Sequence, residues 1–217
     1  MQHHRLMLWH MTNNDLPLRS YTGGMAQTNG YLLGSSKDGG PCILIDAPLG
    51  ISQWLQELGE QPQCLLLTHQ HYDHVEDAAA LVAMGVELYA YSAYSQDLTL
   101  ERLLQQSGIP IDIETYQVDH ILEGCSTLDA GGLSFTLKHV PGHSKDSLVF
   151  IHNDLVFGGD TLFAGGIGRA DLPGGDMDLL IHGIQEKMLS LAPSARVFPG
   201  HGPDTTIAIE KATNPYL

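Results

Sequence analysis

The first half of the chain alternates short apolar runs with stretches in which apolar residues recur every three or four positions. Short apolar runs between polar residues are typical of buried strands. They predict strands at Ile43–Ile45, Leu65–Leu67 and Val86–Ala90. The periodic stretches predict three helices, whose apolar faces are Ile51, Leu55 and Leu58; Val75, Ala78, Ala79 and Val82; and Leu100, Leu103 and Leu104. A glycine follows each of these faces and can end the helix.

The second half is richer in strands. Its apolar runs predict strands at Thr115–Val118, Leu133–Val140, Leu148–Ile151, Leu155–Phe157 and Arg196–Phe198. Leu180, Ile184 and Met188 lie on one face of a predicted helix, for which Asp176 is the expected N-cap. Strands followed by helices in each half favour two sheets packed together with helices on their outer faces, an α/β sandwich.

Composition and charge narrow the class of protein. The 217 residues are 43% hydrophobic and 16% charged, which suits one globular domain over 1–217. A formal net charge of −15 disfavours nucleic acids and anionic membrane surfaces as partners. The three cysteines, Cys42, Cys64 and Cys125, form no C-x-x-C pair, and residues 1–15 have the pattern of neither a signal peptide nor a membrane span. We therefore expect a cytoplasmic protein with reduced thiols.

Candidate chemistry is concentrated in Thr68–His74, with the sequence T-H-Q-H-Y-D-H. The segment begins where the predicted strand Leu65–Leu67 ends. His69 and His71 are two residues apart, so in extended backbone their imidazoles project to the same side. Asp73 and His74 follow at the start of the next helix and point elsewhere. Four nitrogen and oxygen ligands in two directions are what a pair of adjacent metal ions requires.

Three later segments add metal-competent side chains, each after a strand and next to a glycine. They are Val140–His143 with the sequence V-P-G-H, Gly158–Asp160 with G-G-D, and Pro199–Gly202 with P-G-H-G. Ligands held at the ends of rigid strands keep their geometry. A lone buried histidine is usually a core residue, but seven candidate ligands in this order favour a metal centre.

The motifs resemble the metallo-β-lactamase superfamily. H-x-H-x-D-H is followed in order by P-G-H, G-D-T-L-F and P-G-H-G. The stretch Gly159–Asp176 and the tail that begins at Gly200 are most similar to short bacterial members of the glyoxalase II branch, the hydroxyacylglutathione hydrolases. The resemblance covers the chain from about Asn29 onward. It implies a four-layer αββα sandwich and hydrolysis of a small thioester, S-acylglutathione or a similar compound.

The resemblance also implies two divalent metal ions per chain, zinc above all, with iron and manganese as alternatives. The implied ligands are His69, His71 and His143 for the first ion, Asp73, His74 and His201 for the second, and Asp160 as the bridge between them. In this family a hydroxide also bridges the metals and attacks the thioester carbonyl. The carboxylates of Asp73 and Asp160 are the expected catalytic residues.

Several positions depart from the resemblance or leave it open. The C-terminal helical domain that contributes glutathione contacts in longer enzymes is not expected in this sequence. Lys145-Asp146 replaces a common Pro-Gly pair after the third histidine motif. Arg169 has two interpretations: it binds a substrate carboxylate, or it pairs with Asp171. Asp46 also has two: it orients a ligand imidazole, or it caps a turn before Pro48.

Two other functions stay open. A persulfide dioxygenase, a mononuclear iron relative, keeps a similar G-R-x-D stretch, which is Gly168–Asp171 here. The G-D-T-L-F and P-G-H-G motifs resemble glyoxalase II more closely. The alternative outside the enzymes is a metal-binding module without catalysis on the same fold. Decayed relatives usually lose ligands, whereas all seven ligand positions are filled here.

Overall fold

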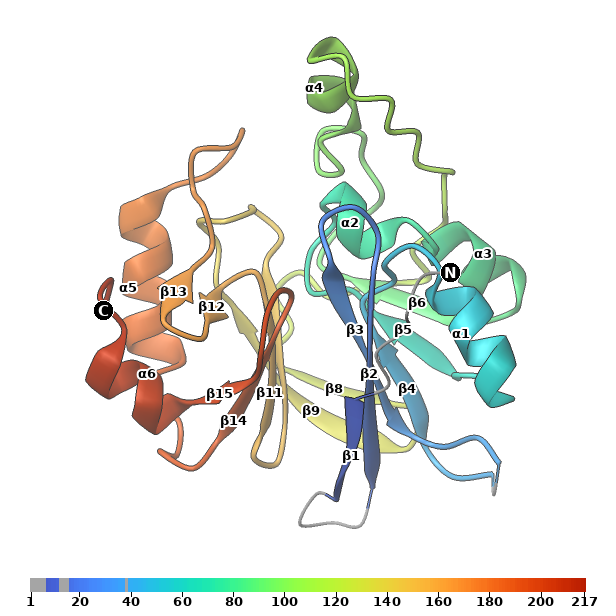
Figure 1. Ribbon diagram of the computed structural model, residues 1–217, viewed down its shortest axis with the longest axis horizontal. Coiled ribbons are helices and arrows are strands. Elements are labelled where there is room, and N and C mark those ends of the chain that lie inside the picture. The colour runs from blue at the N-terminus through green and yellow to red at the C-terminus, as the bar shows by residue number, and fades with distance from the viewer. Residues whose placement is uncertain (1–6, 12–15, 38) are drawn as a thin grey trace.

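The computed structural model describes residues 7–11, 16–37 and 39–217. Two β-sheets face each other in the middle of the molecule, and helices lie on the outer side of each sheet (Figure 1). Most of residues 1–15, where the sequence predicts neither a signal peptide nor a membrane span, lies outside the described residues. Among the described residues, no helix is long and apolar enough to cross a membrane.

The first sheet follows the order of the sequence. Its strands are β1 (Met7–Met11), β2 (Pro17–Gly23), β3 (Thr28–Gly34), β4 (Cys42–Ile45), β5 (Cys64–Leu66), β6 (Glu87–Ala90) and β7 (His120–Ile121). Strands β4 to β7 run parallel to one another. The helices of this half are α1 (Ile51–Leu58), α2 (Tyr72–Val75), α3 (Ala78–Ala83) and α4 (Glu101–Gln106). Helix α4 projects from the body of the molecule on two long connecting segments (Figure 1).

The second sheet has the order β15-β14-β11-β10-β9-β8. Its strands are β8 (Thr127–Ala130), β9 (Leu133–His139), β10 (Leu148–His152), β11 (Leu155–Gly159), β14 (Arg196–Pro199) and β15 (Thr205–Thr206). A small hairpin of β12 (Leu162–Phe163) and β13 (Gly166–Ile167) follows β11. Helices α5 (Met177–Lys187) and α6 (Ile207–Thr213) cover the outer face (Figure 1).

Three apolar layers hold the sandwich together, as the period of two in a strand requires. Ile43 and Ile45 of β4 point into the layer between the sheets, where Phe150 of β10 also packs. Leu44, between them, points outward and packs with Leu55 of α1. The third layer joins the second sheet to its two helices. Hydrophobic burial on both faces of each sheet therefore fixes a helix–sheet–sheet–helix order.

Most predicted elements are confirmed, including the N-cap, since the Asp176 side chain accepts a hydrogen bond from Leu179 N. The strand predicted at Thr115–Val118 is wrong. Residues 111–118 carry no regular structure, and Ile113 and Tyr116 pack against the outer layer of the first sheet instead. Pairing with β6 begins only at His120.

The single helix predicted through Val75 and Val82 is also wrong, because it is two short helices. The break lies at Asp77, whose N–H donates to Ala47 O at 3.0 Å. The Asp77 carboxylate accepts hydrogen bonds from Gly50 N and from Ser52 at the start of α1. Tertiary bonds therefore replace the continuation of the helix at this residue.

Candidate metal centre

All seven predicted ligands lie at one edge of the sandwich, the edge that carries α2 in Figure 1. His69 to His74 follow β5, and His143 lies in the turn between β9 and β10. Asp160 follows β11, and His201 follows β14. Because β5 belongs to the first sheet and the other strands to the second, the site depends on how the two sheets pack.

Within the described part of the chain, these side chains form three overlapping groups whose ligand atoms lie within 4.8 Å of one another. The groups are His69, His71 and His143; His69, His74 and Asp160; and Asp73, His74 and His201. Asp160 lies between them, since its Oδ2 is 3.5 Å from His143 Nε2 and 3.2 Å from His201 Nε2. The geometry therefore offers two neighbouring sets of ligands with one carboxylate between them.

In three of the histidines, hydrogen bonds fix which ring nitrogen is left to bind a metal ion. His74 Nδ1 donates to Asp46 Oδ2 at 2.8 Å, and His143 Nδ1 donates to the carbonyl oxygen of Arg169 at 2.8 Å. His69 Nδ1 lies 3.2 Å from Thr68 Oγ1, whose own proton is donated to Asp46 Oδ2. In each ring the Nδ1 proton is committed to this bond, so Nε2 is the nitrogen left to bind an ion.

The same three Nε2 atoms are buried and have no hydrogen-bond partner, and Asp160 Oδ1 shares this state. His74 Nε2 and Asp160 Oδ1 lie 3.3 Å apart, but without the geometry of a hydrogen bond. Buried polar atoms are almost always partnered in native proteins. Imidazole nitrogens and a carboxylate oxygen aimed at one another fit zinc, iron or manganese ions.

His69 and His71 of the first group and His201 of the second have pKa values shifted in opposite directions. Burial, followed by the neighbouring imidazoles, holds the pKa of His69 well below its usual range and lowers that of His71 to about 3. Burial would also lower the pKa of His201, but the carboxylates of Asp160 and Asp73 raise it to about 10. His69 and His71 are thus neutral at physiological pH and ready to bind a cation. A cation at the second group takes the place of a proton.

Residues beyond the predicted ligands hold the centre together. Asp46 receives hydrogen bonds from Thr68 N and Thr68 Oγ1 as well as from His74. Thr28 Oγ1 donates to Asp73 Oδ2 at 2.6 Å. Thr28 and Thr68 were missed because a lone threonine in an apolar stretch carries no sequence signal. Adjacency to His69 is the one clue that marks Thr68.

Asn29 and Tyr31 were missed in the same way. Tyr31 Oη donates to Pro199 O at 2.7 Å, and Asn29 Nδ2 donates to Pro199 O and Gly202 O. Strand β3 therefore fixes the turn that carries His201. No pattern in the sequence predicts β3, because its buried residues begin with Thr-Asn-Gly rather than with apolar side chains.

Arg169 occupies a different place from the seven ligands. Its guanidinium forms a two-pronged pair with Asp171, at 2.7 and 2.8 Å, and both side chains are exposed. The pairing that the sequence left as one of two interpretations is present. Arg169 also contributes its backbone carbonyl to His143, a role that its side-chain chemistry does not predict.

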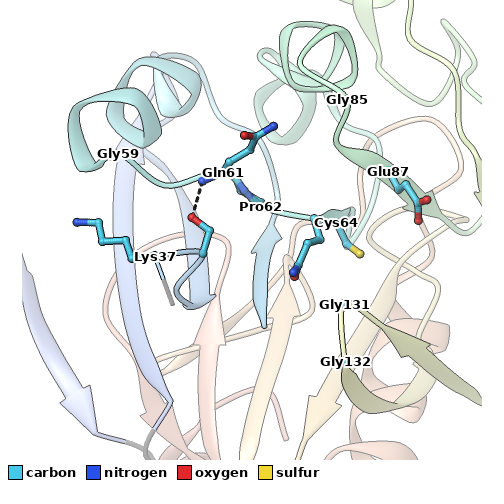
Figure 2. Close-up of a pocket in the computed structure, with 11 residues that line it drawn as sticks. Lys37, Gly59, Gln61, Pro62, Cys64, Gly85, Glu87, Gly131 and Gly132 are labelled. Atoms are coloured by element: carbon cyan, nitrogen blue, oxygen red, sulfur yellow. Dashed lines mark hydrogen bonds between the residues drawn. The ribbon is translucent and has the colours of Figure 1, made fainter. Parts of the chain in front are cut away.

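An open pocket of about 840 Å³ lies elsewhere, beside the amino ends of β5 and β6. Figure 2 shows Lys37, Cys64 and Glu87 around it, with Gly131 and Gly132 on one side. None of the seven predicted ligands lines this pocket. The ligand chemistry of the molecule therefore lies at the opposite ends of these strands.

Residues 23–201 match the Metallo-beta-lactamase superfamily. The chain belongs to this superfamily. It is 36% identical over 203 residues to the probable metallo-hydrolase YqgX of Bacillus subtilis, which covers 89% of this chain and 94% of the relative. It is 38% identical over 172 residues to the hydroxyacylglutathione hydrolase GloC of Haemophilus influenzae, which covers 76% of this chain and 80% of the relative.

Two solved structures of the superfamily are similar over almost their whole length. The BLEG-1 B3 metallo-beta-lactamase superposes with a TM-score of 0.82 at 32% identity, covering 92% of this chain and 99% of the other. TTHA1623 in a di-iron-bound form has a TM-score of 0.78 at 34% identity, covering 91% and 99%. The expected four-layer fold is confirmed, and the chain is a hydrolase-type, metal-dependent member of the superfamily.

Proposed function

We propose that this superfamily member is a dinuclear metallohydrolase that cleaves small thioesters in the manner of glyoxalase II. The observation that carries the proposal is the set of buried Nε2 atoms at His69, His74 and His143, which face Asp160 without hydrogen-bond partners. The name of the GloC relative supports a thioester substrate. The di-iron form of TTHA1623 supports two ions of a first-row metal.

In this proposal His69, His71 and His143 hold one ion, and Asp73, His74 and His201 hold the other, with Asp160 between them. When bound, divalent ions polarise a carbonyl oxygen and lower the pKa of water from 15.7 to about 7. The protein contributes position and protonation state. Its hydrogen-bonded Nδ1 atoms keep each ring turned so that Nε2 faces the site.

Arg169 has a proposed role in binding rather than in chemistry. Its side chain is 62% exposed and borders the loop after Asp160, whose glycines leave room for a substrate. Exchange of Asp171 for a substrate carboxylate keeps the two-pronged geometry of the guanidinium. A carboxylated thioester is therefore the substrate class that we assign to the site.

Hydrolysis of a thioester panel by chelated and metal-reloaded protein tests this function. The panel contains S-lactoylglutathione, a carboxylated thioester without glutathione and a neutral thioester. We expect turnover only after reloading with zinc, iron or manganese, fastest with the carboxylated compounds. If fully loaded protein cleaves none of the thioesters, the proposal is contradicted. Oxygen consumption with a persulfide, by protein that holds one iron, favours the mononuclear dioxygenase.

A further inference from the structure

The first group of ligands is assembled from two separate segments. His69 and His71 lie after β5 of the first sheet, whereas His143 lies in the turn between β9 and β10 of the second sheet. Their ligand atoms lie within 4.8 Å of one another, and they must stay close together to share an ion. Something must therefore hold the segment 69–71 against the turn 140–147.

Gln70, between the two histidines, is fully buried and bonded on three sides. Its N–H donates to Asp146 Oδ2 at 3.0 Å. Its Nε2 donates to Ser92 O at 3.1 Å, and its Oε1 accepts from Tyr116 Oη at 2.9 Å. The backbone between the two ligands is thus tied to the second sheet, and the side chain to the segment that carries α4.

Asp146 makes the connection from the other side. It is 2% exposed, and its Oδ1 accepts from the hydroxyl of Ser144, the residue after His143, at 2.5 Å. One carboxylate therefore bonds next to a ligand on each segment. Burial raises the pKa of Asp146, which reflects the cost of keeping a carboxylate there. Neither the ligand set nor the apolar core requires an acid at this place.

We propose that Gln70 and Asp146 form a clamp between the two segments, and that Asp146 is a positioning residue for the first metal group. The inference rests on the proposed metal-dependent function. Among the described residues, this carboxylate accepts hydrogen bonds from Gln70 N and Ser144 Oγ and from no ligand imidazole. It acts through Gln70 N and Ser144 Oγ, and so fixes the distance between His143 and the pair His69 and His71. Such supporting bonds typically change metal affinity by about 10–100-fold.

The experiment titrates Co²⁺ into metal-free full-length chain that carries His201→Ala, which removes a ligand of the second group so that the first group fills first. Asp146→Ala, Asp146→Asn and the control Glu60→Ala are added to this background. Glu60 is also buried, at 4% exposed, and accepts hydrogen bonds from Ser36 N and Arg19, but it lies outside the centre. Absorption spectra and thermal unfolding of the metal-free proteins are recorded alongside.

We expect Asp146→Ala to weaken Co²⁺ binding by about 10–100-fold and to alter the ligand-field spectrum. Asp146→Asn should restore both, because its oxygen can accept from Gln70 N while its amide donates to Ser144 Oγ. Glu60→Ala should lower the unfolding temperature and leave affinity and spectrum unchanged. If Asp146→Ala fails to fold, Tyr116→Phe, which removes one bond to Gln70, is measured and should shift affinity in the same direction.

The clamp is overturned if Asp146→Ala lowers the unfolding temperature as Glu60→Ala does while binding Co²⁺ with unchanged affinity and spectrum. It is also overturned if Asp146→Asn binds as weakly as Asp146→Ala, since charge rather than hydrogen bonding would then be responsible. These results leave the proposed function intact. Failure of the unmutated chain to bind Co²⁺ at all would overturn both proposals.

Discussion

Single hydrogen bonds decide which ring nitrogen His69, His74 and His143 offer to a metal ion. Asp46 accepts from His74 Nδ1, and the Arg169 carbonyl accepts from His143 Nδ1. The other neutral tautomer would carry its proton on Nε2, where the ion must bind. Among the described residues, the Asp160 carboxylate lies beside imidazoles of both groups, so the proposed pair of ions should depend most on this residue.

Asp160→Ala should therefore remove metal and activity together. Loss of the carboxylate removes the anion that lies between His143 of the first group and His201 of the second. We expect at least about 10²-fold slower thioester hydrolysis, in keeping with changes in residues that support a metal site. Elemental analysis after dialysis, together with steady-state rates, measures both effects. Wild-type metal content and turnover in this variant would refute the role of Asp160.

Arg169→Ala tests whether the Arg169 guanidinium binds a substrate carboxylate. If the guanidinium binds a carboxylate, KM for carboxylated thioesters should rise by about tenfold or more, while a neutral thioester is unaffected. Thermal stability and metal content should change little, because the pair with Asp171 is exposed. Equal losses on both substrates, with a lower unfolding temperature, would make the pair structural.

Glu60 gives a pH-dependent stability that is separate from the metal centre. Burial would raise the pKa of Glu60, but hydrogen bonds from Ser35 and Ser36, and then from Arg19, lower it to about 2 from 4.5. The folded state therefore binds this proton less readily than the unfolded state does. The resulting stability is present above about pH 4.5 and is lost as the pH falls toward 2.

Glu60→Gln in metal-free protein should accordingly lower the free energy of unfolding by roughly 2–3 kcal/mol at pH 7. Denaturant titrations across the acid range measure it. The difference from the unmutated protein should shrink steadily below pH 4.5. A difference that stays constant down to pH 2.5 would show that another property of the substitution is responsible.

At the scale of elements, strand ends deliver the ligands and glycines give them room. A Cβ on Gly200, just after β14, would collide with Asp160 Oδ1 and lie 2.7 Å from His74 Cε1. The backbone here approaches the centre so closely that only a hydrogen atom fits. The turn that carries His201 can therefore take this path only because residue 200 has no side chain.

Gly200→Ala should reduce metal affinity by about tenfold or more. Gly202→Ala is the matched control, since Gly202 has a φ of +74° but no atom within 4 Å of an added Cβ. The control should lower stability by about 1–2 kcal/mol through backbone strain and keep its metal. Metal content after dialysis and unfolding temperatures compare the two. Equal metal loss in both variants would contradict a steric effect at Gly200.

The sequence predicts elements well where a strand or helix buries apolar residues in a regular period. Ile43–Ile45 and Leu180, Ile184 and Met188 are of this kind. It fails where tertiary bonds replace local preference. β3 is buried along its whole length although it begins Thr-Asn-Gly, and Asp77 ends a helical segment by bonding to another loop. The hydrogen-bond partners that decide these elements are distant in the sequence, so no local pattern predicts them.

The same limit applies to the site. The ligands could be predicted because histidines and aspartates beside glycines at strand ends are a pattern that few functions other than metal binding require. The residues that orient them are not: Thr28 is distant in the chain from Asp73, and Arg169 acts on His143 through a backbone atom. A carbonyl is present in every residue, so its role can be found only from the fold.

At the scale of the whole molecule, the centre exists only when the two sheets are packed together. The first sheet supplies His69 to His74, and the second supplies His143, Asp160 and His201. Leu148 N also donates to Thr68 O at 2.7 Å, which joins the sheets directly beside the ligands. Metal binding and docking of the two halves are therefore coupled, since an ion bound by both sheets stabilises the folded state.

The most direct test of the account is the number and spacing of the ions. Metal-free protein is reloaded with zinc, its metal content is measured after dialysis, and the loaded sites are located by anomalous diffraction. We expect two ions per chain, roughly 3.5–4 Å apart, one at His69, His71 and His143 and the other at Asp73, His74 and His201, with Asp160 between them. A single tightly bound ion, with a second group that no divalent metal fills, would contradict the account.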